Sequence, residues 1–152
     1  MIADTDELTK LQSRWAGSDH MLDRMKKLVT VTFATGGITS HGLSLVVYNL
    51  PLLLAFDVLK QTLAQARSEG LITCSGNHLG PLMDSGRDAL PWEDWEGLRD
   101  GVRRRNEVAH DGKLFDSQQC IQDIERVKVQ LVAWDIISAG PRDDPGSLEA
   151  VE

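Results

Sequence analysis

Apolar residues recur every three or four positions along most of the chain, and this spacing predicts amphipathic helices. We expect the first helix to begin after Asp4, which forms a capping-box pattern with Glu7, and to run to about Phe33. Gly17 and Ser18 interrupt this helix and predict a bend. Its predicted buried side chains are Leu8, Leu11, Trp15, Leu22, Met25 and Val29.

A second helix is expected from about Ser40 to Ser68, and its first half is apolar on nearly every side. Such a helix lies either at the centre of a bundle or in a membrane. The apolar run extends only from Leu43 to Phe56, whereas a membrane-spanning helix needs about 20 residues. We therefore favour a central helix and no membrane span, with Pro51 either kinking the helix or resetting its start. Part of its apolar surface is a candidate dimer face.

A glycine-rich segment over residues 70–89 predicts a long loop, with a short helical turn near Leu79 to Asp84. Loops of this length in compact domains are commonly functional, so we expect it to cover a cleft. His78 lies in this loop. It is either a second proton carrier or, as we favour, a surface histidine.

Two further helices are expected in the last third of the chain. Pro91 is a suitable first residue for the third helix, and Gly112 is expected to end it. Asp116 with Gln119 predicts the cap of the fourth helix, which should end near Gly140. The predicted buried stripe of the fourth helix is Cys120, Ile124, Val127, Leu131 and Trp134.

The predicted fold class is therefore all-α, an up-and-down bundle of four main helices with a short extra helical turn between the second and third. One domain is expected over residues 1–140, followed by a disordered acidic tail over 141–152. The formal net charge of −7 argues against a generally basic nucleic-acid coat protein, so any RNA binding must be local.

The cysteines and histidines of the chain predict no disulfide framework and no metal site. Cys74 and Cys120 are the two cysteines, and no secretory signal is evident, so we expect a cytoplasmic protein with reduced thiols. Together with His78 and His110 they nominally supply four zinc ligands, but no Cys-x-x-Cys or His-x-x-x-His pair is present. We expect neither a metal nor a cofactor.

The third helix carries an arginine on its apolar stripe. Trp95, Leu98, Val102 and Ala109 define the stripe, and Arg105 falls on it. A buried arginine is costly unless it is paired or used for function. Arg105 is thus either a structural arginine bonded to a carboxylate of a neighbouring helix or a ligand-binding one.

The neighbouring arginines form a basic patch around this position. Arg103 and Arg104 are expected to project toward solvent or a ligand, and with Lys113 they form a candidate RNA-binding surface. The alternative is a solvated helix end, where arginines are favoured by the helix dipole. Glu107 and Asp111 either tune His110 or, as we favour, pair with Arg103 and Arg104.

Arg105, Asn106 and His110 place a permanent cation, an amide and a titratable imidazole within six residues. Arginine can hold a phosphate while histidine moves protons, which suits cleavage of a phosphodiester by the adjacent 2′-hydroxyl of RNA. On an ideal helix His110 lies about 140° around from Arg105. Therefore either the last turn unwinds near Ala109 or the two residues act together across a dimer.

This Arg–Asn–x₃–His pattern resembles the HEPN superfamily of all-helical domains, in which an arginine precedes a polar residue and a histidine follows four to six residues later. The resemblance extends from Leu43 to Ile137 in helix order, but covers only Arg105 to His110 in residue detail. One common version of the motif has a tyrosine where this chain has Gly112.

The resemblance implies a metal-independent endoribonuclease of a toxin, phage-defence or stress-response system. It implies a homodimer in which the Arg and His pairs of both chains meet in one cleft, and RNA as the partner. Arg105, Asn106 and His110 would be catalytic, and an antitoxin or regulatory protein could be a further partner. Because some family members only bind, the alternative is a non-catalytic dimeric interaction or nucleotide-binding module in a regulatory complex.

Overall fold

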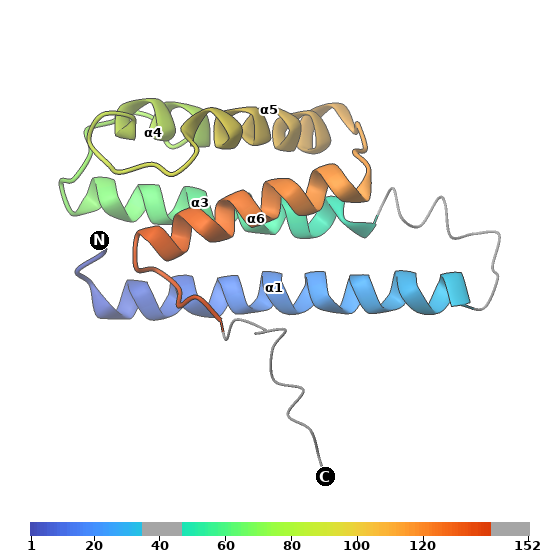
Figure 1. Ribbon diagram of the computed structural model, residues 1–152. Helices are drawn as coiled ribbons and strands as arrows, with labels where there is room; N and C mark the ends of the chain where they lie inside the picture. Colours follow the sequence, from blue (N-terminus) through green and yellow to red (C-terminus); the bar gives the residue numbers. More distant parts are fainter. Residues whose placement is uncertain (35–46, 141–152) are drawn as a thin grey trace, which may run out of the picture.

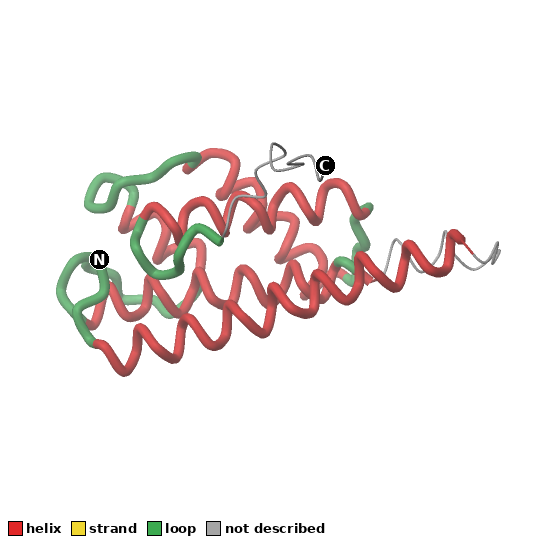
Figure 2. The backbone as a smooth tube through the Cα atoms, turned by 60° about the horizontal axis from the view of Figure 1, so that its bottom comes forward, coloured by secondary structure: helices red, strands yellow, loops and turns green. Residues whose placement is uncertain are grey.

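The computed structural model describes residues 1–34 and 47–140, and this part of the chain is all-α, with five helices and no strand (Figures 1 and 2). The helices are α1 (Thr5–Ala34), α3 (Asn49–Ser68), α4 (Leu79–Gly86), α5 (Trp95–Asp111) and α6 (Ser117–Ala133). The all-α prediction is confirmed at this level. The tail predicted over residues 141–152 lies outside the described residues.

Helix α3 is central, as its all-round apolar pattern predicts, and it packs against α1, α4, α5 and α6. Leu52, Phe56 and Leu59 are completely buried on it. The helix begins at Asn49, so Pro51 lies in its first turn, where the missing N–H of proline is tolerated. The expected start near Ser40 lies outside the described residues.

Most of the predicted helix ends are found where local capping chemistry places them. The carboxylate of Asp4 accepts from the backbone N–H groups of Asp6 and Glu7, and that of Asp116 accepts from Gln119. Helix α1 continues through Gly17 and Ser18, so the predicted interruption there is wrong. The fourth helix ends at Ala133 rather than near Gly140, while its predicted stripe, Cys120 to Trp134, is buried.

The predicted start of the third helix at Pro91 is also wrong. Helix α5 begins at Trp95, with Asp94 as its N-cap. The backbone carbonyl of Pro91 instead accepts hydrogen bonds from the side chains of Gln130 and Trp134. Because these contacts tie residue 91 to the end of α6, the helix starts one turn later than the sequence predicts.

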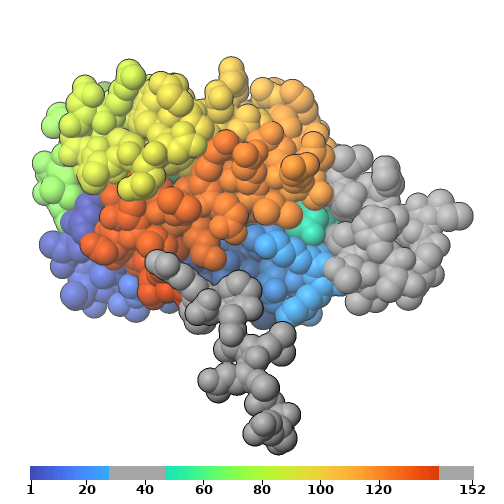
Figure 3. All heavy atoms as spheres, in the orientation of Figure 1, coloured from blue at the N-terminus to red at the C-terminus, as the bar shows by residue number. Residues whose placement is uncertain are grey.

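The long helices lie in tiers, with α1 below, α3 and α6 between, and α4 and α5 above (Figure 1). In the space-filling view α6 forms the middle of the visible face, between α5 and α1 (Figure 3). The N-terminal amino group lies 3.3 Å from the carbonyl oxygen of Trp134, which brings the start of the chain to the end of α6. None of the described helices is both long and apolar enough to cross a membrane.

Candidate active site

Helix α5 is held close against α3 by a glycine. A Cβ atom at Gly101 would lie 2.6 Å from the Cζ atom of Phe56, so only a residue without a side chain permits this approach. Leu98 and Val102 are buried beside it. The predicted stripe therefore holds in the first half of α5, but Ala109 is exposed, so the stripe ends before the motif does.

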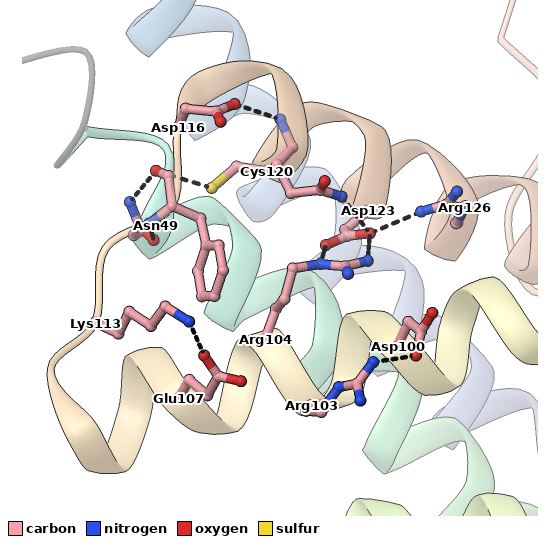
Figure 4. Close-up of polar contacts among 12 residues, drawn as sticks. Asn49, Asp100, Arg103, Arg104, Glu107, Lys113, Asp116, Cys120, Asp123 and Arg126 are labelled. Carbon is pink, nitrogen blue, oxygen red and sulfur yellow. Dashed lines mark hydrogen bonds and ion pairs between the residues drawn. The ribbon is translucent and has the colours of Figure 1, made fainter.

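The other side of α5 is joined to α6 by a buried ion pair (Figure 4). The Arg104 guanidinium donates two hydrogen bonds of 2.7 Å to Asp123, whose side chain is fully buried. Arg126 donates a third bond of 2.9 Å to the same carboxylate. The hydrogen bonds that Arg104 donates to Asp123 raise the pKa of Arg104 above its usual value. This pair fixes the rotation of α5 about its axis.

The prediction that Arg104 projects toward solvent or a ligand is therefore wrong. Its partner was visible in the sequence, because Asp123 lies three residues after Cys120 and four before Val127, on the apolar stripe of α6. A carboxylate on such a stripe needs a cation from another element. Arg104 is the cation that the packing supplies.

The predicted partners of the other charged side chains are also wrong. Arg103 pairs with Asp100 at the surface, and Glu107 pairs with Lys113 (Figure 4). The Lys113 ammonium also lies 4.9 Å from the ring centroid of Phe115. All three predicted RNA-binding side chains are thus bonded to carboxylates within the chain.

Arg105 is half-buried on the α5 stripe and has no carboxylate partner among the described residues. One guanidinium nitrogen, Nη1, donates a 3.1 Å hydrogen bond to the side-chain oxygen of Asn106. The Nε atom is buried and has no acceptor within the described part of the chain. Burial without an acceptor is costly for a guanidinium N–H. The Nε atom of Arg105 is therefore a donor whose hydrogen bond is missing within the described residues.

The three predicted catalytic residues line one pocket of about 230 Å³. Arg105, Asn106 and His110 form its α5 wall, although α5 continues unbroken to Asp111. The last turn of α5 therefore does not unwind near Ala109, and both Arg105 and His110 nevertheless line the same pocket. The side chain of Arg105 turns toward Asn106, and Asn106 lies one helical turn before His110.

The opposite wall comes from two elements that the motif does not include. Lys60 of α3 lies there, together with His78, Leu79, Gly80 and Pro81 at the start of α4. The prediction that the loop covers a cleft agrees with this arrangement, and Figure 1 shows α4 beside α5 above α3. His78 was expected to be a surface histidine. It is exposed, but it also lines the pocket of the motif.

A larger hollow of about 510 Å³ runs along the outer side of α5 and shares Asn106 and His110 with this pocket. Arg99 and Arg103 line it, as do the carboxylates of Asp100, Glu107 and Asp111. Of the predicted RNA-binding residues, Arg103 therefore lies next to the motif. Arg104 and Lys113 line neither hollow.

The two cysteines are free thiols in different environments. Burial raises the pKa of Cys120 to about 12. A hydrogen bond with the Ser85 side chain, followed by one with the backbone of Gly76, holds the pKa of Cys74 below its usual value. Among residues 1–34 and 47–140, no three His, Cys, Asp or Glu side chains are grouped as metal ligands would be.

Comparison of the chain with protein-family models, with curated proteins and with solved structures finds no match. The resemblance to the HEPN superfamily therefore rests on Arg105, Asn106 and His110 together with the helical fold.

Proposed function

We propose that this protein is a metal-independent endoribonuclease of HEPN type, which cleaves RNA through the 2′-hydroxyl. The observation that carries the proposal is the pocket that Arg105, Asn106 and His110 share, with no Asp or Glu among the described residues that line it. A cationic pocket with an imidazole suits a phosphodiester, because the phosphate is anionic and the reaction requires proton transfer.

In the proposed reaction the ribose 2′-oxygen attacks phosphorus and the bond to the 5′-oxygen breaks. His110 is exposed at the pocket and acts as general base or general acid. Arg105 stabilises the charge on the pentavalent phosphorane, since its fork of N–H groups matches phosphate oxygens. Asn106, bonded to Arg105, orients the guanidinium and the phosphate. The products are a 2′,3′-cyclic phosphate and a 5′-hydroxyl.

Further features of the HEPN class belong to the same proposal. They are an up-and-down order of four main helices, a homodimer, and a toxin, phage-defence or stress-response setting in the cytoplasm with an antitoxin or regulatory partner.

The test is cleavage of end-labelled RNA in EDTA by the wild type, His110→Ala and His20→Ala. His20 is an exposed histidine of α1, far from the motif in the chain, and serves as the matched control. We expect cyclic-phosphate ends from the wild type and the control, and no cleavage by His110→Ala with an unchanged circular dichroism spectrum. Cleavage by His110→Ala, or its unfolding, would contradict the proposal.

A second candidate, a non-catalytic module that binds a nucleotide, is favoured by the pairing of the basic patch. Because Arg103, Arg104 and Lys113 all bond to carboxylates, little free positive charge remains for a long RNA. Under this alternative the chain dimerises and acts in a regulatory complex. Intact RNA after long incubation, together with nucleotide binding that Arg105→Ala abolishes, would establish it.

A further inference from the structure

The pocket of the motif is enclosed by three helices of one chain. Helix α5 supplies Arg105, Asn106 and His110, α3 supplies Lys60, and the start of α4 supplies His78. Two imidazoles and two cationic side chains thus surround a space of about 230 Å³. Neither Lys60 nor His78 belongs to the predicted motif, and both are brought to it by the packing of α3 and α4 against α5.

The charges in this pocket are not balanced within the described residues. The described lining residues include no carboxylate, and Lys60 forms no ion pair within the described part of the chain. This is unusual for a protein of net charge −7, in which Arg103, Arg104 and Lys113 all find carboxylates close by. The buried Nε atom of Arg105 lacks an acceptor as well. An anion in the pocket would supply the missing negative charge.

The first turn of α4 adds backbone donors to the same pocket. Hydrogen bonding of α4 begins at Leu82, whose N–H donates to the carbonyl of His78. Leu79 and Gly80 precede it, and their N–H groups have no acceptor within a helix that starts there. Both residues line the pocket, so the positive end of the α4 dipole lies beside the side-chain cluster.

From this geometry we infer that one chain holds a complete phosphoryl-binding site, in which Lys60 and His78 act together with Arg105 and His110. The inference rests on the proposed function for its substrate, the phosphodiester of RNA. Lys60 and Arg105 bind the phosphate oxygens from two sides. The second imidazole comes from His78 of the same chain, whereas the family resemblance places the second histidine in a partner chain.

The two histidines then divide the proton transfers of cleavage. One neutral imidazole accepts the proton of the 2′-hydroxyl as the 2′-oxygen bonds to phosphorus. The other imidazole, protonated beforehand, donates a proton to the 5′-oxygen as its bond to phosphorus breaks. The enzyme therefore ends with one proton exchanged between His78 and His110, and no oxidant, metal or further reactant is consumed.

The binding site is tested by titrating the wild type with inorganic phosphate. Proton NMR signals of the histidine rings report the binding. The chain has four histidines, so single His→Gln variants assign the signals. We expect the His78 and His110 signals to move together with one dissociation constant and the His20 signal to stay fixed. Movement of only one of the pair, or of neither, would overturn the inference.

Lys60→Gln should weaken phosphate binding by about tenfold or more, because it removes a charge-assisted hydrogen bond. Lys10→Gln, at an exposed lysine of α1, is the matched control and should bind phosphate as the wild type does. Lys60→Arg keeps the charge and should retain binding, which separates loss of charge from loss of fold. Wild-type affinity in a folded Lys60→Gln protein would overturn the role of Lys60.

RNA cleavage separates this inference from the proposed function. His78→Gln should lower kcat by about 100-fold with little change in KM. Mixing His78→Gln with His110→Gln after joint unfolding and refolding should not restore activity, because each chain lacks one histidine. Restored activity, or wild-type kcat in His78→Gln, would refute the single-chain site and leave the ribonuclease standing. Phosphate binding without any cleavage would refute the ribonuclease and leave the binding site standing.

Discussion

Two adjacent arginines of α5 have opposite environments. Arg104 is bonded through two nitrogen atoms to Asp123 of α6, which is completely buried and also accepts from Arg126. Arg105 faces α3 and α4, where an amide oxygen of Asn106 is its hydrogen-bond partner within the described residues. The side of α5 with a complete set of partners holds the fold together. The side that lacks an anion is the one suited to bind a ligand.

The comparison predicts that Arg105 matters for activity and Arg104 for stability. Under the proposed function, Arg105→Ala should lower the rate of RNA cleavage by about 100- to 1,000-fold, because it removes the donor proposed to stabilise the phosphorane. Its effect on the free energy of unfolding should stay below about 1 kcal/mol, since a buried nitrogen without an acceptor is removed as well. Cleavage assays and urea unfolding measure the two effects.

Arg14→Ala, at an exposed arginine of α1, is the control for this substitution and should change neither quantity. If Arg105→Ala unfolds the protein, Arg105 is a structural residue. In that case the two sides of α5 do not differ in the way proposed.

Asp123→Asn should lower the free energy of unfolding by about 3 kcal/mol, because it leaves Arg104 without its buried counter-charge. The control is Asp100→Asn, whose carboxylate pairs with Arg103 at the exposed surface and should contribute less than about 1 kcal/mol. Urea unfolding at neutral pH compares the two variants. Equal losses would mean that burial does not distinguish the two arginine–aspartate pairs.

Two glycine-to-alanine substitutions should change the free energy of unfolding in opposite directions. Gly101→Ala should cost about 2 kcal/mol, because the added Cβ atom would overlap Phe56 and push α5 away from α3. Gly17→Ala should stabilise the protein by about 0.5–1 kcal/mol, because α1 leaves open space there and alanine is the better helix former. Thermal unfolding of both variants tests this. Stabilisation by Gly101→Ala would disprove the close contact between α5 and α3.

Ionisation of the Cys120 thiol on α6 should also make the protein less stable at alkaline pH. Burial raises the pKa of this thiol to about 12, so the unfolded chain loses the proton at lower pH than the folded protein does. Stability is therefore present below about pH 9 and falls as the pH rises, by about 1.4 kcal/mol for this group at pH 10. Tyr48, whose pKa burial also raises, acts in the same direction.

Urea unfolding at pH 8 and pH 10 measures this loss. Cys120→Ala is the matched variant: it should be less stable at pH 8 but lose about 1.4 kcal/mol less than the wild type on going to pH 10. An identical loss in both proteins would show that the Cys120 thiol reaches solvent, and that the α6 side is not closed.

The structural features that the sequence predicted correctly are those whose contacts lie within one or two helical turns along the chain. The caps formed by Asp4 and Asp116 bond to N–H groups three residues on, and Gly112 ends α5 in a left-handed conformation with φ 65°. Each of these contacts is local, so the sequence spacing contains it. Pro91 was misread because its carbonyl binds α6, and that contact depends on residues some forty positions away.

By itself the sequence determined the helical class, the buried stripe of α6, and the presence of Arg105, Asn106 and His110 within six residues. Only the tertiary structure decided that Arg104 is bonded to Asp123 while Arg105 lacks an anion, and that Lys60 and His78 join the pocket. The physical reason is that helical periodicity predicts which residues are buried. The partner that each one meets depends on how α3, α4 and α6 pack around α5.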